Sequence, residues 1–403
     1  MAARPLDGLD LRAVGRALEA LGADGWLLFD FHQLNPVASR VLGSGGMGTR
    51  RLFVWLPRQG RPTAVVHRVE QDSLRNFPGD LRLYSSWREL HIELRALVAG
   101  RTLAMEVSPL DAVPYLDRVP SGVVQLVESF GGRVVSSASL VTRFAARWTD
   151  GDLAGHRRAA AVLASAAAEA LRWAGAETAR GAEVRETTVQ HRVMETMARA
   201  GLVTDHPPIV GFQENAALPH YEPREGADRR LQAGDVLLLD LWAGPGPGTV
   251  FADQTWMAFA GRAPDAEVRK VWDAVRRARD AVVERLRERW PGPASAAGTQ
   301  GGGVTGAELD DTARGVIRDA GYGEYFVHRT GHSIDRQLHG SGPHLDNFET
   351  ADTRLLVPGI GFSVEPGIYL PGRFGMRSEI NVYLGPEGVE VTPTDPQRDL
   401  LLV

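Results

Sequence analysis

Two glutamates near the C-terminal end of the chain stand among residues that otherwise favour the interior of a β-sheet. Residues 361–370 and 376–384 read as two strands joined by a turn rich in proline and glycine, and they carry Glu365 and Glu379 respectively. Two buried carboxylates that face each other repel, so such a pair needs a cation or a shared proton. The alternative is that both glutamates pair with arginines, and Arg377 is close enough in sequence to be one partner.

Two aspartates farther upstream have a similar setting. Asp240 closes the apolar run VLLL, and Asp253 lies on the strand that returns after a loop of glycine and proline. Charged residues are rarely fully buried without a partner. Taken alone, Asp240 is more simply explained as a strand-end carboxylate that accepts backbone N–H groups. Thr255, just after Asp253, offers a hydroxyl that can orient a carboxylate.

Histidines are the second type of candidate ligand. The stretch YFVHRTGHSIDRQLH contains His328, His332 and His339, and the stretch NAALPHY ends in His220 and Tyr221. A single histidine is more often a structural residue than a ligand, but a cluster in a glycine-containing loop is harder to explain in that way. The spacing HxxxH is weak by itself, because it lacks the glutamate of the zinc motif HExxH.

The elements that must position these residues follow a pattern that occurs twice. Helical spacing covers residues 153–200, in two pieces broken near 175–181, and the strand-rich region 209–260 follows. Helical spacing returns at 267–290 and 306–319, before the strands and loops of 325–384. Helices followed by strands, twice over, predict an α+β domain with two halves. Residues 291–303, rich in glycine and alanine, are expected to form a loop.

The first part of the chain alternates helices with strands. Helices are expected at residues 9–21 and 123–129, and strands at 26–29, 52–56 and 63–67. The polar segment 148–152 is the expected boundary, which gives domains at 1–148 and 149–403. Gly43, Gly45 and Gly48 form a GxGxxG pattern that precedes a strand instead of following one, so we expect a plain loop there.

Composition excludes several classes of protein. The 403 residues include no cysteine, which removes disulfides, thiol nucleophiles and thiolate zinc sites. Lys270 is the only lysine, so a phosphate-binding GK[ST] motif cannot occur. The net charge of −5 gives no reason to expect nucleic acid or an anionic membrane as a partner. The N-terminus lacks a signal-peptide core, and the longest run of small apolar residues contains charges, so we expect a cytoplasmic protein that does not associate with membranes.

The order of NAALPHY, D…DxT, HxxGH, EPGIY and RSE resembles that of the pita-bread metallopeptidases, which include aminopeptidase P, prolidase and methionine aminopeptidase, with creatinase as a metal-free relative. The resemblance runs from residue 153 to the C-terminus, and five motifs in the right order make it specific. The preceding region resembles the amino-terminal domain of the aminopeptidase P, prolidase and creatinase branch. The fold implied is a creatinase-like α/β domain followed by a pita-bread domain with pseudo-two-fold halves.

The resemblance also assigns roles to residues. It implies that two metal ions are bound by Asp240, Asp253, His332, Glu365 and Glu379, with Asp253 and Glu379 shared between them. One imidazole and four carboxylates suit manganese, with cobalt or zinc as alternatives. Glu365 would also move protons, His220 and His339 would stabilise the tetrahedral intermediate, and the substrate would contact His328, Arg377 and Tyr221.

The implied activity is that of an exopeptidase that cleaves Xaa–Pro bonds in peptides or dipeptides, and the implied assembly is a homodimer. Alternatives are a creatinase-like amidinohydrolase, whose relatives have lost these ligands, and a pseudoenzyme that acts as a binding module. The sequence does not separate a dipeptidase from an aminopeptidase; an arginine such as Arg354 or Arg377 that captures the substrate carboxylate would decide it. Asp335 replaces a glycine of the family pattern and Gly340 an acidic residue, which affects the expected shape of the pocket.

Overall fold

The computed structural model describes residues 5–43, 48–290 and 303–403, and the chain forms two compact units, Met1–Ala146 and Arg147–Val403. Gly45 of the glycine pattern and residues 291–302 of the expected loop lie outside the described residues. Within the described part of the chain, no helix is long and apolar enough to cross a membrane.

The first unit is a six-stranded mixed sheet with the strand order β4-β3-β2-β1-β5-β6. Its strands are β1 (Gly25–Asp30), β2 (Leu52–Pro57), β3 (Thr63–His67), β4 (Asp80–Tyr84), β5 (Thr102–Met105) and β6 (Arg133–Ser136). Its α-helices are α1 (Leu11–Leu21), α2 (Pro36–Leu42), α3 (Trp87–Val98), α4 (Ser121–Ser129) and α5 (Ala138–Leu140). Short helical turns are η1 (Arg68–Leu74), η2 (Pro109–Asp111), η3 (Pro114–Leu116) and η4 (Val141–Ala145).

Both faces of this sheet are covered, because every residue of β1 is buried. Trp26 and Leu28 pack into one hydrophobic cluster with residues of α1 and α2, while Leu27 and Phe29 pack into a second cluster with residues of α3 and α4. Successive side chains of a strand point to opposite faces. The continuous apolar run of β1 therefore supplies two cores, as expected for an α/β layer arrangement.

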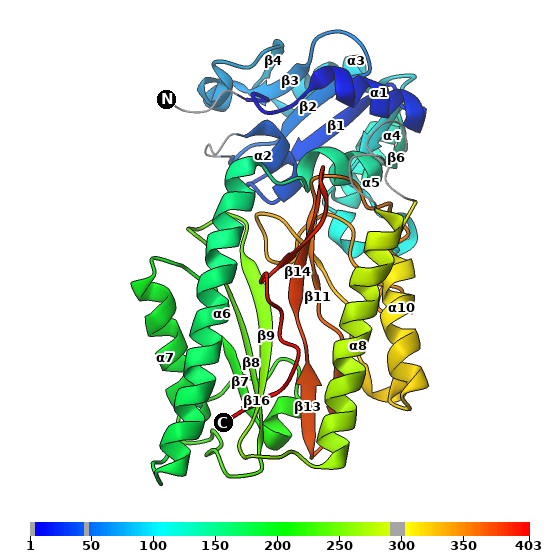
Figure 1. Ribbon diagram of the computed structural model, residues 1–403. Helices are drawn as coiled ribbons and strands as arrows, with labels where there is room; N and C mark the ends of the chain where they lie inside the picture. Colours follow the sequence, from blue (N-terminus) through cyan, green and yellow to red (C-terminus); the bar gives the residue numbers. More distant parts are fainter. Residues whose placement is uncertain (1–4, 44–47, 291–302) are drawn as a thin grey trace. The chain divides into compact units, whose positions relative to one another are not determined.

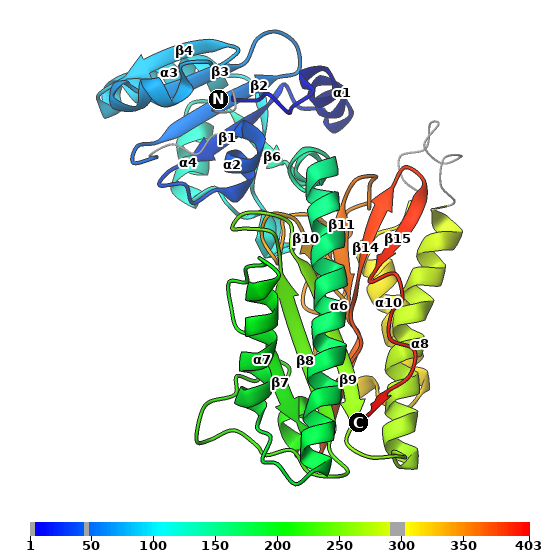
Figure 2. The ribbon, with the colours of Figure 1, turned by 60° about the vertical axis from the view of Figure 1, so that its left-hand side comes forward.

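The second unit contains the repeated pattern of helices and strands (Figures 1 and 2). Its first half has α6 (Asp150–Ala179), α7 (Glu186–Arg199), β7 (Ile209–Phe212), η5 (Gln213–Ala217), β8 (Val236–Ala243) and β9 (Ala252–Phe259). Its second half has α8 (Ala266–Arg289), α10 (Gly306–Asp319), η6 (Gly323–Tyr325), β10 (Ser333–Ile334), β11 (Gly361–Val364), β12 (Gly367–Leu370), β13 (Phe374–Arg377), β14 (Ile380–Gly385) and β15 (Gly388–Thr392). The chain ends in β16 (Leu401–Leu402), which pairs with β9.

The two halves repeat one local arrangement at the start of a helix. The residue before α7, Arg185, forms an isolated antiparallel β-bridge with the backbone of Arg230. The residue before α10, Thr305, forms the same kind of β-bridge with Leu355. The strands form two four-stranded sheets, β16-β9-β8-β7 and β10-β11-β14-β15, and a separate ribbon of β12 and β13. Helices followed by strands therefore do occur twice, as the sequence predicts.

The C-terminal strands differ from the prediction, because each expected strand is two strands with different partners. The first is interrupted at Glu365 and Pro366, and the second at Ser378 and Glu379. On one side of the breaks β11 pairs with β14, and on the other side β12 pairs with β13. Pro366 has no N–H to donate to a ladder, which favours the change of partner there.

Candidate metal centre

The alternation of β8 directs Asp240 away from the helices. Leu237, Leu239 and Leu241 pack into the hydrophobic cluster that includes residues of α6 and α7. Asp240 lies between them in sequence, so its side chain points to the opposite face of the sheet. Thr255 pairs with Asp240 across the β8–β9 ladder, so its side chain lies on the same face.

Asp253 reaches the same face from β9. It pairs with Trp242, two positions along β8 from Asp240. Gln254, the next residue, points the other way and donates a hydrogen bond to the carbonyl oxygen of Ala160 on α6 (2.9 Å). Asp240 and Asp253 are both buried, with 7% and 4% of their surface exposed. The two aspartates are therefore presented together on the face that the helices do not cover.

His332 enters the site from the loop before β10, and its protonation pattern follows from its contacts. Its Nδ1 lies 3.2 Å from the carbonyl oxygen of Ser333, which can only accept, so Nδ1 carries the proton. Its Nε2 faces Asp253 Oδ2 at 3.3 Å and Glu365 Oε1 at 3.5 Å. Ionised carboxylates also only accept, so a cation, either a proton or a metal ion, is needed between these three groups.

Glu365 and Glu379 occupy the two breaks between strands. Ser363 donates its hydroxyl to Glu365 Oε1 (3.0 Å), and Thr255 donates its hydroxyl to Glu379 Oε2 (2.8 Å). The hydroxyl of Thr255 thus orients a carboxylate as expected, but that carboxylate belongs to Glu379. Ligand atoms of Asp253, His332 and Glu379 lie within 4.8 Å of one another, close enough to share one metal ion.

Three carboxylate oxygens in this cluster have no hydrogen-bond partner among the described residues. They are Oδ1 of Asp240, Oδ1 of Asp253 and Oε1 of Glu379, and all three are buried. Unpaired buried acceptors are costly. The second oxygens of Asp240 and Glu379 do have donors, from Arg377 and Thr255. The three unpaired oxygens are hard donors of the type that divalent metal ions prefer, so they fit such ions.

The pKa values of the carboxyl groups show that burial and mutual repulsion oppose their ionisation. Burial raises the pKa of Asp240 to about 7, and burial together with neighbouring carboxylates raises the pKa of Asp253 and, strongly, that of Glu379. Burial opposes ionisation of Glu365 as well, but the positive charges of His332, Arg377 and Arg329 outweigh it and lower its pKa to about 2. Asp240, Asp253 and Glu379 thus resist being charged together beside the ionised Glu365, and bound cations would remove that resistance.

Arg377 joins the site through Asp240 and not through either glutamate. The guanidinium of this buried arginine forms an ion pair with Asp240, and its Nε donates to the hydroxyl of Thr255 (2.8 Å). Among the described residues no ion pair joins an arginine to Glu365 or Glu379. The alternative in which arginines satisfy both glutamates is therefore wrong.

A chain of hydrogen bonds leads from Arg377 to His328. Arg377 Nη1 donates to the hydroxyl of Tyr369 (3.3 Å), which lies 2.8 Å from His328 Nε2. His328 Nδ1 lies 2.7 Å from the carbonyl oxygen of Arg329 and so carries the proton. Tyr369 therefore donates to Nε2, and burial lowers the pKa of His328 to about 4. Sequence reasoning missed Tyr369, although it is the last residue of the EPGIY motif.

The two histidines expected to stabilise the intermediate lie at the edge of the site and are exposed. The ring of His339 lies 4.3 Å from that of His332. The positive charge of His332, with smaller contributions from Arg329 and His220, lowers the pKa of His339 to about 3. His220 and His339 thus belong to the same surroundings as the carboxylate cluster.

Glu186, the first residue of α7, holds the segment that carries His220. It is fully buried, and all its hydrogen-bond partners are donors. It accepts from the backbone N–H groups of Phe212 (2.7 Å) and Arg229 (2.8 Å), from Asn215 Nδ2 (3.1 Å to each oxygen) and from the hydroxyl of Tyr221 (2.7 Å). Tyr221 therefore supports the histidine segment. An acidic residue in the first turn of a helix needs no special explanation, so no signal in the sequence pointed to Glu186.

The two departures from the family pattern compensate each other. Asp335 accepts hydrogen bonds from the backbone of Gln337 and Ser341, both at 2.8 Å, and so fixes the turn after β10. A Cβ atom at Gly340 would fall 2.7 Å from Cγ of Asp335. The aspartate thus occupies the space that a side chain at position 340 would need. Arg354 is occupied elsewhere, by Asp352 and by the carbonyl oxygens of residues 341 and 342.

Comparison with known proteins gives the class of protein that this fold and site define. The model of metallopeptidase family M24 matches residues 154–386, and the chain belongs to that family. It is 30% identical over 362 residues to the probable dipeptidase PepE of Mycobacterium tuberculosis, covering 86% of this chain and 84% of the relative. It is also 30% identical to the Xaa-Pro dipeptidase of Lactobacillus helveticus, over 53% of this chain and 48% of the relative.

Solved structures extend the likeness to the first unit. Dipeptidase PepE of Mycobacterium ulcerans is similar over 97% of this chain and 96% of its own, with a TM-score of 0.72 and 26% identity. A prolidase from Thermococcus sibiricus shares the fold over 98% of both chains, with a TM-score of 0.66 and 22% identity. The expected two-domain pita-bread architecture is therefore confirmed.

Proposed function

We propose that this protein is an Xaa-Pro dipeptidase that works with two divalent metal ions, most suitably manganese. The observation that carries the proposal is the trio of buried carboxylate oxygens without partners, on Asp240, Asp253 and Glu379, beside the lone pair of His332. The names of the relatives support the substrate class, since they include dipeptidases and Xaa-Pro dipeptidases. The same ligands distinguish the chain from a metal-free amidinohydrolase or a pseudoenzyme.

Bound metal ions would polarise the scissile carbonyl group and lower the pKa of a water nucleophile. The chain supplies the rest of the chemistry. Glu365 remains ionised beside Ser363 and is the proposed proton carrier from the water to the leaving proline nitrogen. His220 and His339, at the edge of the site, are proposed to donate hydrogen bonds to the developing oxyanion. His328, held by Tyr369, is proposed to contact the substrate.

The choice of a dipeptidase makes a direct prediction. With manganese added, the protein should hydrolyse Xaa-Pro dipeptides at least about tenfold more efficiently, in kcat/KM, than the matching Xaa-Pro-Xaa tripeptides. Xaa-Ala dipeptides are the control for the proline requirement. Faster cleavage of the tripeptides would indicate an aminopeptidase, and equal cleavage of Xaa-Ala would remove the proline preference. Arg354 and Arg377 are already occupied by Asp352 and Asp240, so capture of the substrate carboxylate by either is not part of this proposal.

A homodimer is also part of the proposal, by likeness to the prolidase branch. A stable interface of that kind buries about 1,600 Å² or more in total. Light scattering at working concentration is expected to give twice the mass of the 43.7 kDa chain. A monomer with full activity would contradict it. The cytoplasmic location expected from the sequence stays a prediction.

A further inference from the structure

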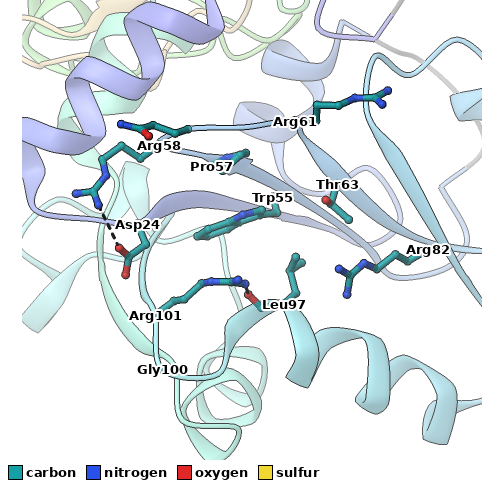
Figure 3. A pocket seen from close by; sticks show the side chains of 11 residues that line it. Asp24, Trp55, Pro57, Arg58, Arg61, Thr63, Arg82, Leu97, Gly100 and Arg101 are labelled. Carbon is teal, nitrogen blue, oxygen red and sulfur yellow. Dashed lines mark hydrogen bonds and ion pairs between the residues drawn. The ribbon is translucent and has the colours of Figure 1, made fainter.

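A cavity in the first unit lies at one end of its six-stranded sheet (Figure 3). It has a volume of about 480 Å³ and is bordered by the residue before β1, the end of β2 and the start of β3. The end of α3 and the loop before β5 close another side. This volume is in the range of sites for small molecules. None of the residues proposed to bind metal or substrate lines it.

The lining of the cavity is strongly basic. It includes four arginines, Arg58, Arg61, Arg82 and Arg101, and a single carboxylate, Asp24. This local excess of positive charge stands out because the chain as a whole carries a net charge of −5. Guanidinium groups present forked donors that match carboxylate and phosphate oxygens. The charge of the lining therefore selects an anion.

Three of these arginines keep their donors available. Arg58 lies 3.8 Å from Asp24, Arg61 lies 3.8 Å from Asp80, and Arg82 lies 3.6 Å from Glu93. These separations are too long for hydrogen bonds, and all three arginine side chains are at least 36% exposed. Such ion pairs contribute little to stability, so an anion with better geometry can replace them at small cost.

Two buried side chains that line the cavity also have unused polar groups. Trp55 and Thr63 are 5% and 7% exposed, respectively. Neither the indole N–H of Trp55 nor the hydroxyl of Thr63 has a hydrogen-bond partner among the described residues. Arg101 is fixed over the ring of Trp55, 5.8 Å from its centroid, and donates to the carbonyl oxygen of Leu97 at the end of α3. Neither polar atom is among the fully buried unpaired atoms of the described residues, so both remain open to solvent at the cavity and are available to donate to a ligand.

We propose that this cavity binds a small phosphate compound that carries at least two negative charges. The four arginines line the cavity from different elements and do not meet at one point (Figure 3), which suits a ligand with several anionic groups. Thr63 and Trp55 would donate hydrogen bonds to its oxygens, and Arg58 and Arg82 would bind from two sides. The source of the phosphate groups is either an inorganic polyphosphate or a nucleotide. The proposal does not depend on the peptidase activity.

Isothermal titration calorimetry of the metal-loaded full-length protein tests the proposal, with sodium triphosphate as the probe and ATP in a parallel arm. We expect saturable binding of one triphosphate per chain, weakened at least tenfold by Arg82→Gln and severalfold by Thr63→Val. Arg75→Gln is the matched control, because Arg75 is an exposed arginine of the same unit that does not line the cavity. Tighter binding of ATP than of triphosphate would identify a nucleotide as the source.

Three outcomes would overturn the proposal. One is the absence of measurable binding at millimolar triphosphate. Another is an equal loss of affinity in Arg75→Gln and Arg82→Gln, which would show only a general attraction to positive charge. The third is binding that survives both Arg82→Gln and Thr63→Val, which would place the anion elsewhere, for instance at the metal ions. Circular dichroism and unchanged peptide hydrolysis would verify that the variants are folded.

Discussion

Removal of the metal ions is expected to abolish peptide hydrolysis, with less than about 1% of the activity remaining after exhaustive dialysis against a chelator. The reason is that Asp240, Asp253 and Glu379 each leave one buried oxygen unpaired within the described chain. Without cations these groups take up protons, since burial raises their pKa values. A protonated carboxyl group neither binds a metal ion nor activates a nucleophile.

The measurement combines elemental analysis of the dialysed protein with an activity assay. Adding manganese back should restore activity, and the comparison with cobalt and zinc at equal occupancy tests the preferred metal. Asp265→Asn is a suitable control, because this aspartate caps α8 and takes no part in the cluster. Full activity in protein shown to be free of metal would end the two-metal interpretation.

Replacement of His220 by alanine is expected to lower kcat by roughly 100-fold or more, the scale of a lost proton donor or oxyanion contact. Metal content should stay near that of the unmodified protein. The reason is that His220 is exposed and that, among the described residues, no recorded hydrogen bond or ion pair joins it to the five proposed ligands. Parallel loss of metal and activity would instead make His220 a ligand.

Glu186 provides the sharper control for that experiment. Glu186→Gln places an amide NH₂ group against four donors, and leaving a buried donor unpaired costs about 1–3 kcal/mol. The segment around His220 should shift and kcat should fall. If Glu186 acts through His220, the same change in a His220→Ala background should cause little further loss. Glu183→Gln, an exposed neighbour, should leave kcat unchanged.

The family, the two-part fold and the metallopeptidase class were all predictable from the sequence, and all are confirmed. The reason is that five motifs occur in the order of the family, which makes the resemblance specific although each motif alone is weak. Asp240 alone, inside VLLLDLW, is more simply explained as a strand-end carboxylate. The individual roles of the site residues stay predictions, although the structure gathers the five proposed ligands. The metal's identity and the dimer also stay predictions.

Other features could not be predicted, for physical reasons. The hydrogen bonds of Glu186 join groups up to 43 positions away, and nothing local in the sequence encodes such contacts. The separation of β11 from β12 depends on which strands they meet, because residues on both sides of the break favour strands equally. The mutual fit of Asp335 and Gly340 is visible only where a turn brings them together.

The change of strand partners at Glu365 and Glu379 separates the sheets, which hold the proposed metal ligands, from the β12–β13 ribbon, which can vary in sequence without moving them. Both glutamates lie at the junctions between the four-stranded sheet β10-β11-β14-β15 and the β12–β13 ribbon. The ribbon packs so closely against the His220 segment that a Cβ at Gly375 would fall 2.1 Å from the carbonyl oxygen of Ala216. Evolution can therefore reshape the ribbon and the segment it touches, and with them the choice of substrate, while the sheets keep the carboxylates in place.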